Sequence, residues 1–253
     1  MQTPELPGKI AIVTGGSRGI GRGIALKLAQ EGATVVINST EGSRELVGEV
    51  IKTMKGYGVD GLWVPGDISQ EETGERLVAE TVEHFGRLDI LVHNAGITDN
   101  DFAIRTTGER WRRVIETNLS SGFYVGKPAY IQMNRQREGV ALFVSSVVAH
   151  GNAGQASYAA SKSGLEGLMR GLAVEYMSLK RPIRANAVAF GGVKTDMVEK
   201  LTDEQREALI KATPLGRLIT IEEASEVALF LVSPRSAIIN GAVIDADGGM
   251  LRR

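Results

Sequence analysis

Hydrophobic positions along the chain fall into short β-branched runs separated by longer stretches with helical spacing. A run such as Lys9–Thr14 is typical of a buried parallel strand, whereas Ile20, Ile24 and Leu28 recur on one face of a helix. Strands are predicted over residues 9–14, 33–38, 62–65, 89–93, 140–145, 183–189 and 242–245. No linker or repeat interrupts the alternation. It predicts an α/β fold in a single domain, residues 1–253, with a doubly wound parallel seven-stranded sheet and helices on both faces.

Capping boxes mark three predicted helix starts. A serine or threonine is followed three residues later by Glu or Gln at 69–72, 202–205 and 220–223. Two further long helices are predicted over residues 109–127 and 155–177.

The composition narrows the class of protein. Of 253 residues, 43% are hydrophobic and 23% are charged, which is ordinary for a globular protein. A formal net charge of −1 argues against a nucleic-acid partner. Cysteine is absent, so neither disulfides nor a thiolate metal site exist, and no metal is expected. No apolar run approaches the roughly 18 residues of a membrane span, so we expect no membrane partner and a cytoplasmic location.

A glycine-rich turn over residues 15–21 stands between the first strand and a helix. Glycines let the backbone approach a pyrophosphate closely, and the N–H groups at a helix N-terminus favour an anion. The turn therefore predicts a Rossmann-like dinucleotide site. Its predicted binding residues are Gly15, Ser17, Arg18, Gly19, Ile20 and Gly21.

The end of the second strand bears on the choice of cofactor. It reads Asn38-Ser39-Thr40, where dinucleotide folds often place an acid that binds the adenosine ribose. Without that acid a 2′-phosphate meets no repulsion, and Arg18 can bind it with a charge-assisted hydrogen bond. We therefore expect NADP in preference to NAD, in contact with Ser39 and Thr40. Glu41 lies in the same loop and leaves NAD open.

Polar residues also follow the next two strands. Asp67 and Ile68 come after the third strand, and Asn94-Ala95-Gly96 come after the fourth. Open parallel sheets bind ligands beyond the carboxyl ends of their strands, so these residues are expected on the cofactor side.

Tyr158 and Lys162 are the candidate proton-transfer pair. They are four residues apart, so on a helix they lie on one face, one turn from each other. An ammonium beside a phenol favours the phenolate and draws its pKa down from about 10. Ser145 and Ser146 end a strand, and Asn118 falls inside a predicted helix, where asparagine is unfavourable unless its amide finds partners.

Taken in order, these motifs resemble the short-chain dehydrogenase/reductase family. The resemblance covers nearly the whole chain: residues 14–21, Asn94-Ala95-Gly96, Asn118, the serine pair, Tyr158-x-x-x-Lys162 and Asp245-Ala-Asp-Gly-Gly. It implies hydride transfer between a nicotinamide and a carbonyl carbon, with Tyr158 as acid and base. Lys162 would lower the phenol pKa and hold the nicotinamide ribose, a serine would orient the carbonyl, and Asn118 would fix a water. Further cofactor positions that match the family are Gly191, Val193 and Thr195.

The sequence departs from the family pattern at three places. The usual spacing to the tyrosine selects Ser145, whereas the local pattern Ser-Ser-Val-Val-Ala selects Ser146, which we prefer. Phe190 stands where the family usually has proline, and its ring is expected to add an apolar wall near the nicotinamide. His93 replaces a usual asparagine and is interpreted as a strand-end packing residue.

Residues 154–162 and 194–197 resemble 3-oxoacyl-acyl carrier protein reductases, which implies an acyl carrier protein as partner. Basic residues available to it are Arg135, Arg137, Lys180 and Arg181. Other relatives act on small-molecule ketones or secondary alcohols. The substrate pocket is expected to be lined by His150, Asn152, Phe190 and residues 197–215.

The sequence also bears on motion and on oligomeric state. Residues 194–216 are polar and are predicted to form a mobile substrate flap. The resemblance implies a homotetramer, with the helices that bear Trp111 and Tyr158 at its interfaces. The alternative from another class is a non-catalytic, cofactor-binding regulatory or assembly protein.

Overall fold

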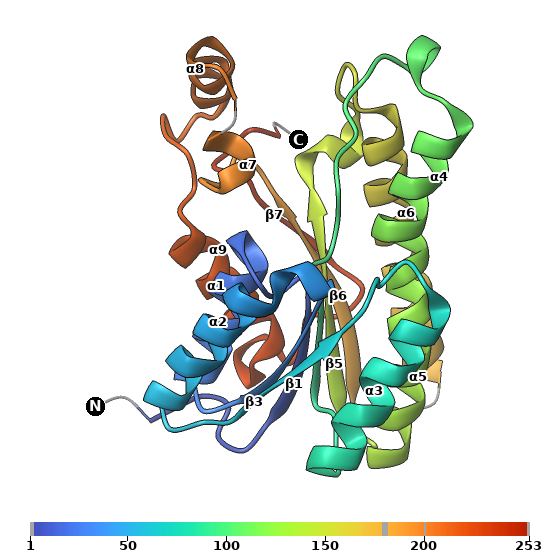
Figure 1. Cartoon of the computed structure of the whole chain (residues 1–253), viewed down its shortest axis with the longest axis vertical. Coiled ribbons are helices and arrows are strands. Elements are labelled where there is room, and N and C mark those ends of the chain that lie inside the picture. Colours follow the sequence, from blue (N-terminus) through green and yellow to red (C-terminus); the bar gives the residue numbers. More distant parts are fainter. Residues whose placement is uncertain (1–2, 179–181, 200, 252–253) are drawn as a thin grey trace.

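The computed structural model describes residues 3–178, 182–199 and 201–251. Within them, seven parallel strands form one sheet in the order β3-β2-β1-β4-β5-β6-β7 (Figure 1). The strands are β1 Ile10–Thr14, β2 Thr34–Ser39, β3 Gly61–Pro65, β4 Ile90–His93, β5 Gly139–Ser146, β6 Ile183–Phe190 and β7 Val243–Ala246. The predicted fold class is confirmed, and every strand end lies within one residue of its predicted position.

Helices cover both faces of the sheet (Figure 1). On one face lie α1 Gly19–Gln30, α2 Arg44–Gly56 and α9 Ile221–Val232. On the other lie α3 Glu71–Phe85, α5 Ser121–Gln136 and α6 Ala156–Ser178. Strand alternation explains the division: along β1, Ala11 and Val13 join the core beneath the first group, and Ile12 joins the core beneath the second. Burying a large aliphatic side chain contributes roughly 1.5–3 kcal/mol, so the two cores fix the helices on the sheet.

The predicted helix over residues 109–127 is longer and interrupted. It runs as α4 Gly108–Ile115, a π-helical turn η3 Glu116–Ser120, and α5, which continues to Gln136. Asn118 lies inside the π turn, so the unfavourable residue coincides with the irregular backbone.

Two of the three predicted capping boxes form. Thr202 and Gln205 open α8 Asp203–Ala212, and Thr220 opens α9. The box at Ser69 is wrong: the Ser69 N–H donates to Oδ1 of Asp67 at 3.0 Å, and α3 begins two residues later. The Asp67 carboxylate forms a local turn that competes with the cap.

Short elements complete the described chain: η1 Glu41–Ser43, η2 Ala103–Arg105, η4 Val147–His150, α7 Asp196–Glu199 and η5 Pro234–Ser236. Across the described ranges, no helix combines the length and the apolar character needed to cross a bilayer.

Candidate active site

Tyr158 and Lys162 share one face of α6 beside the end of β5. Lys162 is 3% exposed, and its ammonium lies 5.7 Å from the Tyr158 ring centroid and donates a 2.8 Å hydrogen bond to the carbonyl of Val144. The predicted helical register of the pair is therefore observed, and the end of β5 holds the lysine in place.

Burial dominates the ionisation of both groups. It lowers the pKa of Lys162 from 10.5 to about 8. It also raises the pKa of the Tyr158 phenol, and a hydrogen bond with Ser146 opposes this rise only in part. The expected lowering of the phenol pKa is therefore wrong, because desolvation of the buried phenol raises its pKa more than the hydrogen bond with Ser146 lowers it. At neutral pH the phenol keeps its proton and can serve as a proton donor.

The two adjacent serines point to different turns of α6. Ser146 contacts the Tyr158 phenol, and its Oγ accepts a 3.2 Å hydrogen bond from the Val148 N–H. Ser145 is buried and donates to Oε1 of Glu166 at 2.8 Å. Tyr158 and Glu166 are eight residues apart, roughly 12 Å along the helix, so one serine cannot serve both. The contact with the phenol belongs to Ser146.

Asn118 is fully buried and its amide is satisfied. Oδ1 accepts from the Ile97 N–H at 2.8 Å, and Nδ2 donates to the Ile97 carbonyl at 2.9 Å and to Ser161 Oγ at 3.1 Å. A Cβ added at Gly96 would lie 3.4 Å from both Asn118 Oδ1 and Lys162 Nζ. The structure therefore brings Asn118, Gly96 and Lys162 together, at a π turn of the kind often found at functional sites.

The glycine-rich turn has the backbone that its sequence predicts. Gly15 and Gly19 have φ values of 64° and 55°, which glycine adopts without strain. A Cβ at Gly21 would lie 2.2 Å from the Gly15 carbonyl oxygen and 2.4 Å from Nδ2 of Asn94. Asn94 itself donates through Nδ2 to the carbonyls of Thr14 at 3.1 Å and Gly15 at 3.3 Å, so it supports the turn.

The residues at this turn fit a dinucleotide phosphate. Helix α1 begins at Gly19 with no side-chain cap from Arg18 and no acidic residue in its first turn. Its first N–H groups, including those of Ile20 and Gly21, have no side-chain acceptor among the residues that the structure describes, and they suit an anion. Ser17 is buried in the turn, and the Arg18 side chain is exposed.

Near the end of β2, where the adenosine ribose is predicted to bind, the structure brings together residues that the sequence did not single out. Ser39 is buried and its Oγ accepts a 3.1 Å hydrogen bond from Nε1 of Trp63. Arg44 lies over the Trp63 ring at 4.8 Å and pairs with Glu41 at 3.1 Å. Thr40 is exposed in the same loop. Glu41 and Arg44 are three residues apart, a spacing that favours an ion pair on a helix. This spacing could have identified Arg44 as a second arginine near the site, in addition to Arg18.

The remaining predicted cofactor residues lie at the same edge of the sheet. Asp67 is exposed and Ile68 is buried after β3, and the Ala95 N–H donates to Thr14 Oγ1 at 3.0 Å after β4. Beyond β6, a Cβ at Gly191 would lie 2.9 Å from the Asp247 carbonyl oxygen, and Val193 forms a parallel bridge to Ile219. A Cβ at Gly19 would lie 3.7 Å from Thr195 Cγ2, so Thr195 adjoins the glycine turn.

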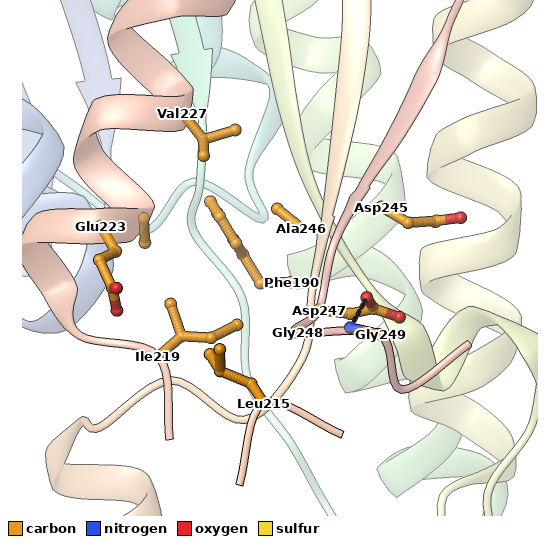
Figure 2. Close-up of a pocket in the computed structure, with 11 residues that line it drawn as sticks. Phe190, Leu215, Ile219, Glu223, Val227, Asp245, Ala246, Asp247, Gly248 and Gly249 are labelled. Carbon is orange, nitrogen blue, oxygen red and sulfur yellow. Dashed lines mark hydrogen bonds between the residues drawn. The ribbon is translucent and has the colours of Figure 1, made fainter. Parts of the chain in front are cut away.

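Phe190 does not face the Tyr158 side of the sheet. Its ring is buried in the core beneath α9, while α6 covers the other core. Figure 2 shows the ring near Ile219, Leu215 and Ala246, where it lines a cavity of about 270 Å³. Side-chain alternation along β6 places Phe190 with Val188 on the α9 face, in the core that also contains Val193, so the apolar wall near the nicotinamide stays a prediction.

The predicted basic residues lie far from Tyr158 within one chain. Arg135 and Arg137 are exposed just before β5 begins, whereas Ser146 ends that strand. Eight residues of β5 span roughly 25 Å, which places these arginines at the opposite edge of the sheet. Lys180 and Arg181 lie outside the described residues. Of the predicted pocket residues, His150 and Asn152 are exposed, and Asn152 Nδ2 donates to Gln155 Oε1 at 2.7 Å.

The doubly wound sheet, the glycine turn and the grouped Tyr, Ser, Lys and Asn side chains define a nicotinamide-dependent oxidoreductase acting on CH–OH groups. A family model described as enoyl-(acyl carrier protein) reductase matches residues 15–251. The chain belongs to the short-chain dehydrogenase/reductase family, which uses NAD(P)H.

Relatives and solved structures agree with this assignment. The chain is 42% identical to the 3-oxoacyl-(acyl-carrier-protein) reductase FabG of Pseudomonas aeruginosa, over 97% of this chain and 98% of that protein. It is 39% identical to FabG of Thermotoga maritima, over 98% and 99%. It resembles the crystal structure of a putative gluconate dehydrogenase from Agrobacterium tumefaciens, with a TM-score of 0.93 and 33% identity over the full length of both chains. A putative short-chain alcohol dehydrogenase from Sinorhizobium meliloti gives a TM-score of 0.91 and 31% identity, over 98% of each chain.

Proposed function

We propose that the protein is an NADP-dependent reductase of 3-oxoacyl groups carried on an acyl carrier protein. The observation that carries the substrate class is the 42% identity, over 97% of the chain, to a protein named for that reaction. The grouping of Ser146, Tyr158 and Lys162 at the carboxyl edge of the sheet supports the reaction type.

The side chains have distinct roles in this proposal. A bound nicotinamide supplies the hydride to the carbonyl carbon. Ser146 orients the carbonyl by donating to its oxygen, and Tyr158 gives that oxygen its phenolic proton as the alkoxide develops. The Lys162 ammonium favours the phenolate that remains. Asn118 keeps the adjoining backbone in place through its three amide hydrogen bonds.

The cofactor would lie along the carboxyl edge of the sheet. The pyrophosphate would meet the turn over residues 15–21, and the nicotinamide would meet Gly191, Val193 and Thr195. Arg18 supports a preference for NADP, because it is exposed at the turn, and Arg44 provides a second cation beside Ser39.

The test compares substrates and cofactors on the same purified protein. Fluorescence titration should show tighter binding of NADPH than of NADH. With NADPH, kcat/KM should be highest for a 3-oxoacyl-acyl carrier protein, lower for the same acyl group on N-acetylcysteamine, and lowest for small ketones.

Tyr158→Phe should lower kcat by about a thousandfold and leave NADPH binding within about twofold, since it removes only the proton donor. A wild-type protein that binds NADPH but reduces no carbonyl would instead support a cofactor-binding regulatory protein.

A second candidate is the interconversion of a small-molecule ketone and a secondary alcohol. Its support is the likeness to the putative gluconate and alcohol dehydrogenases. A keto-gluconate or simple ketone with a higher kcat/KM than both acyl thioesters would favour this candidate.

We also propose that residues 194–216 form a mobile substrate flap. Helix α8, within this segment, has no buried residue among its described ones, so few packing contacts hold it in place. The flap is anchored at its far end, where the Leu215 N–H donates to the Gly248 carbonyl at 3.0 Å. We propose that the protein is a homotetramer. We also propose that it is cytoplasmic, because a chain without cysteine fits a reducing compartment.

A further inference from the structure

His93 lies at the end of β4, between the cofactor turn and the π turn that carries Asn118. Its imidazole is 0% exposed, with Nδ1 3.2 Å from Thr14 Oγ1 and Nε2 3.3 Å from Ser121 Oγ. Thr14 immediately precedes the glycine turn. Ser121 follows the π turn, and its hydroxyl donates at 2.6 Å to the carbonyl of Thr117, the neighbour of Asn118.

Counting donors and acceptors fixes the direction of these hydrogen bonds. Thr14 Oγ1 already accepts from the N–H groups of Asn94 and Ala95, each at 3.0 Å. A hydroxyl has two lone pairs and one hydrogen, so the Thr14 hydrogen is left for Nδ1 of His93. The imidazole hydrogen is then on Nε2, beside Ser121 Oγ, whose own hydrogen goes to Thr117; the ring also forms a hydrogen bond with the backbone of Asn118. Only the neutral Nε2–H tautomer satisfies every member of this chain.

The surroundings hold the ring in that state. Burial and the nearby Lys162 charge lower the pKa of His93 to about 3. The Phe143 ring lies 6.0 Å from the imidazole, centroid to centroid, and a Cβ at Gly122 would lie 3.4 Å from His93 Cδ2, so the ring is closely packed. The packing role predicted for His93 is therefore only part of what this residue does.

We propose that His93 is a positioning residue that couples the cofactor turn to the turn carrying Asn118, through hydrogen bonds from Thr14 to His93, Ser121 and Thr117. The proposal rests on the proposed function, because it concerns how the cofactor and proton-transfer sites are held together. An asparagine amide places a polar atom at the position of Nδ1 and none at that of Nε2. Histidine at this position therefore extends the contact as far as Ser121.

A double-mutant cycle between His93→Asn and Ser121→Ala tests the coupling. Each variant breaks the His93–Ser121 bond and leaves Thr14 an acceptor, so each should lower kcat by about fivefold to tenfold with little change in the KM for NADPH. The double variant should lose no more than His93→Asn alone, because that variant already breaks the bond to Ser121 together with the bond to the Asn118 backbone. Losses that multiply in the double variant would overturn the proposal, as would two single variants with wild-type kcat.

A second measurement does not depend on turnover. The chain has three histidines, so ¹⁵N-labelled protein gives three imidazole signals. One should show the Nε2–H tautomer, stay neutral down to about pH 4, and change its Nε2–H signal in Ser121→Ala. An Nδ1–H tautomer for the buried ring, or a signal unaffected by Ser121→Ala, would overturn the proposal even if His93→Asn does not fold. An absence of carbonyl reduction by the wild type would overturn the proposed function and leave the tautomer result standing.

Discussion

Ser145 donates its hydrogen bond to Glu166, which lies about two helical turns beyond Tyr158 on α6. Its neighbour Ser146 makes the contact with the phenol. Two adjacent serines therefore do different things: one satisfies a buried carboxylate, and the other reaches the proposed proton donor. The distinction depends on how α6 lies against the end of β5.

Alanine at each serine should separate these tasks. Ser146→Ala should lower kcat by about a hundredfold, because it removes a donor that acts on the reacting oxygen, and should lower the free energy of unfolding by no more than about 1 kcal/mol, since the Val148 N–H loses its acceptor. Ser145→Ala should leave kcat within a few fold and lower the free energy of unfolding by about 1–3 kcal/mol, since the buried Glu166 loses its donor. Steady-state kinetics and urea unfolding of both variants measure this. The opposite pattern would assign the catalytic role to Ser145.

Local patterns accounted for much of the fold. The β-branched runs located every strand to within one residue, because a strand buried on both faces needs an unbroken apolar run. The box at Ser69 failed because the competing carboxylate of Asp67 lies two residues away, and a local turn formed instead. The sheet face on which Phe190 lies could also have been predicted from the sequence. Val188 and Phe190 are two residues apart along β6, so their side chains lie on the same face.

The properties that depend on packing could not be predicted from the sequence. Spacing placed Tyr158 and Lys162 on one face of a helix, but the sign of the phenol pKa shift depends on how deeply the chain buries both groups. The Ser145–Glu166 bond and the link from His93 to Ser121 join residues 21 and 28 positions apart. No local pattern specifies such contacts.

Lys162→Met should stabilise the protein while abolishing turnover. A lysine pKa lowered from 10.5 to about 8 by burial corresponds to a cost of about 3 kcal/mol at pH 7, and Met removes it. The Val144 carbonyl loses its donor, which costs about 1 kcal/mol, so the net gain should be about 2 kcal/mol.

The pH dependence of that gain gives the control. Between pH 8 and 10.5 the unfolded lysine holds its proton and the folded lysine releases it, so wild-type stability rises with pH through this window. The advantage of Lys162→Met should therefore shrink from pH 7 to pH 10, as measured by urea unfolding. An advantage that stays constant with pH would show that the burial cost has another origin.

Cofactor preference should respond to the charges beside Ser39. Arg18→Gln should weaken NADPH binding by about tenfold and leave NADH binding unchanged, since only NADPH carries the 2′-phosphate. Glu41→Gln should tighten NADPH binding about twofold to fivefold, because it releases Arg44 and removes a negative charge; both side chains are exposed, so the effect is small. Glu49→Gln on the exposed face of α2 is the matched control. Equal effects on NADPH and NADH would rule out a 2′-phosphate contact.

The proposed homotetramer can be tested at a glycine on α6, the helix that bears Tyr158. A Cβ at Gly171 meets nothing within 4 Å, and the neighbouring Val174 is 69% exposed. Gly171→Leu should therefore be tolerated within one chain and should block a partner helix packed against this face. Gly48→Leu on α2 is the matched control, since it also meets nothing within 4 Å. Sedimentation should show smaller species for Gly171→Leu alone; identical assemblies for both variants would exclude this face.

Arg137 tests the strain and the carrier-docking prediction together. It ends α5 with φ at 64°, a left-handed conformation that is unfavourable for arginine and free for glycine. Arg137→Gly should raise the free energy of unfolding by about 1 kcal/mol. Arg135→Gly, inside the last turn of the same helix, should lower it by about 1 kcal/mol through lost helix propensity.

Both variants also test the docking of a carrier protein, because each removes one positive charge. If an acidic carrier protein docks here to deliver its acyl group to another subunit's site, both should raise the KM for the carrier-bound substrate and not for the N-acetylcysteamine thioester. A KM that follows stability instead of charge would exclude this surface as the docking site.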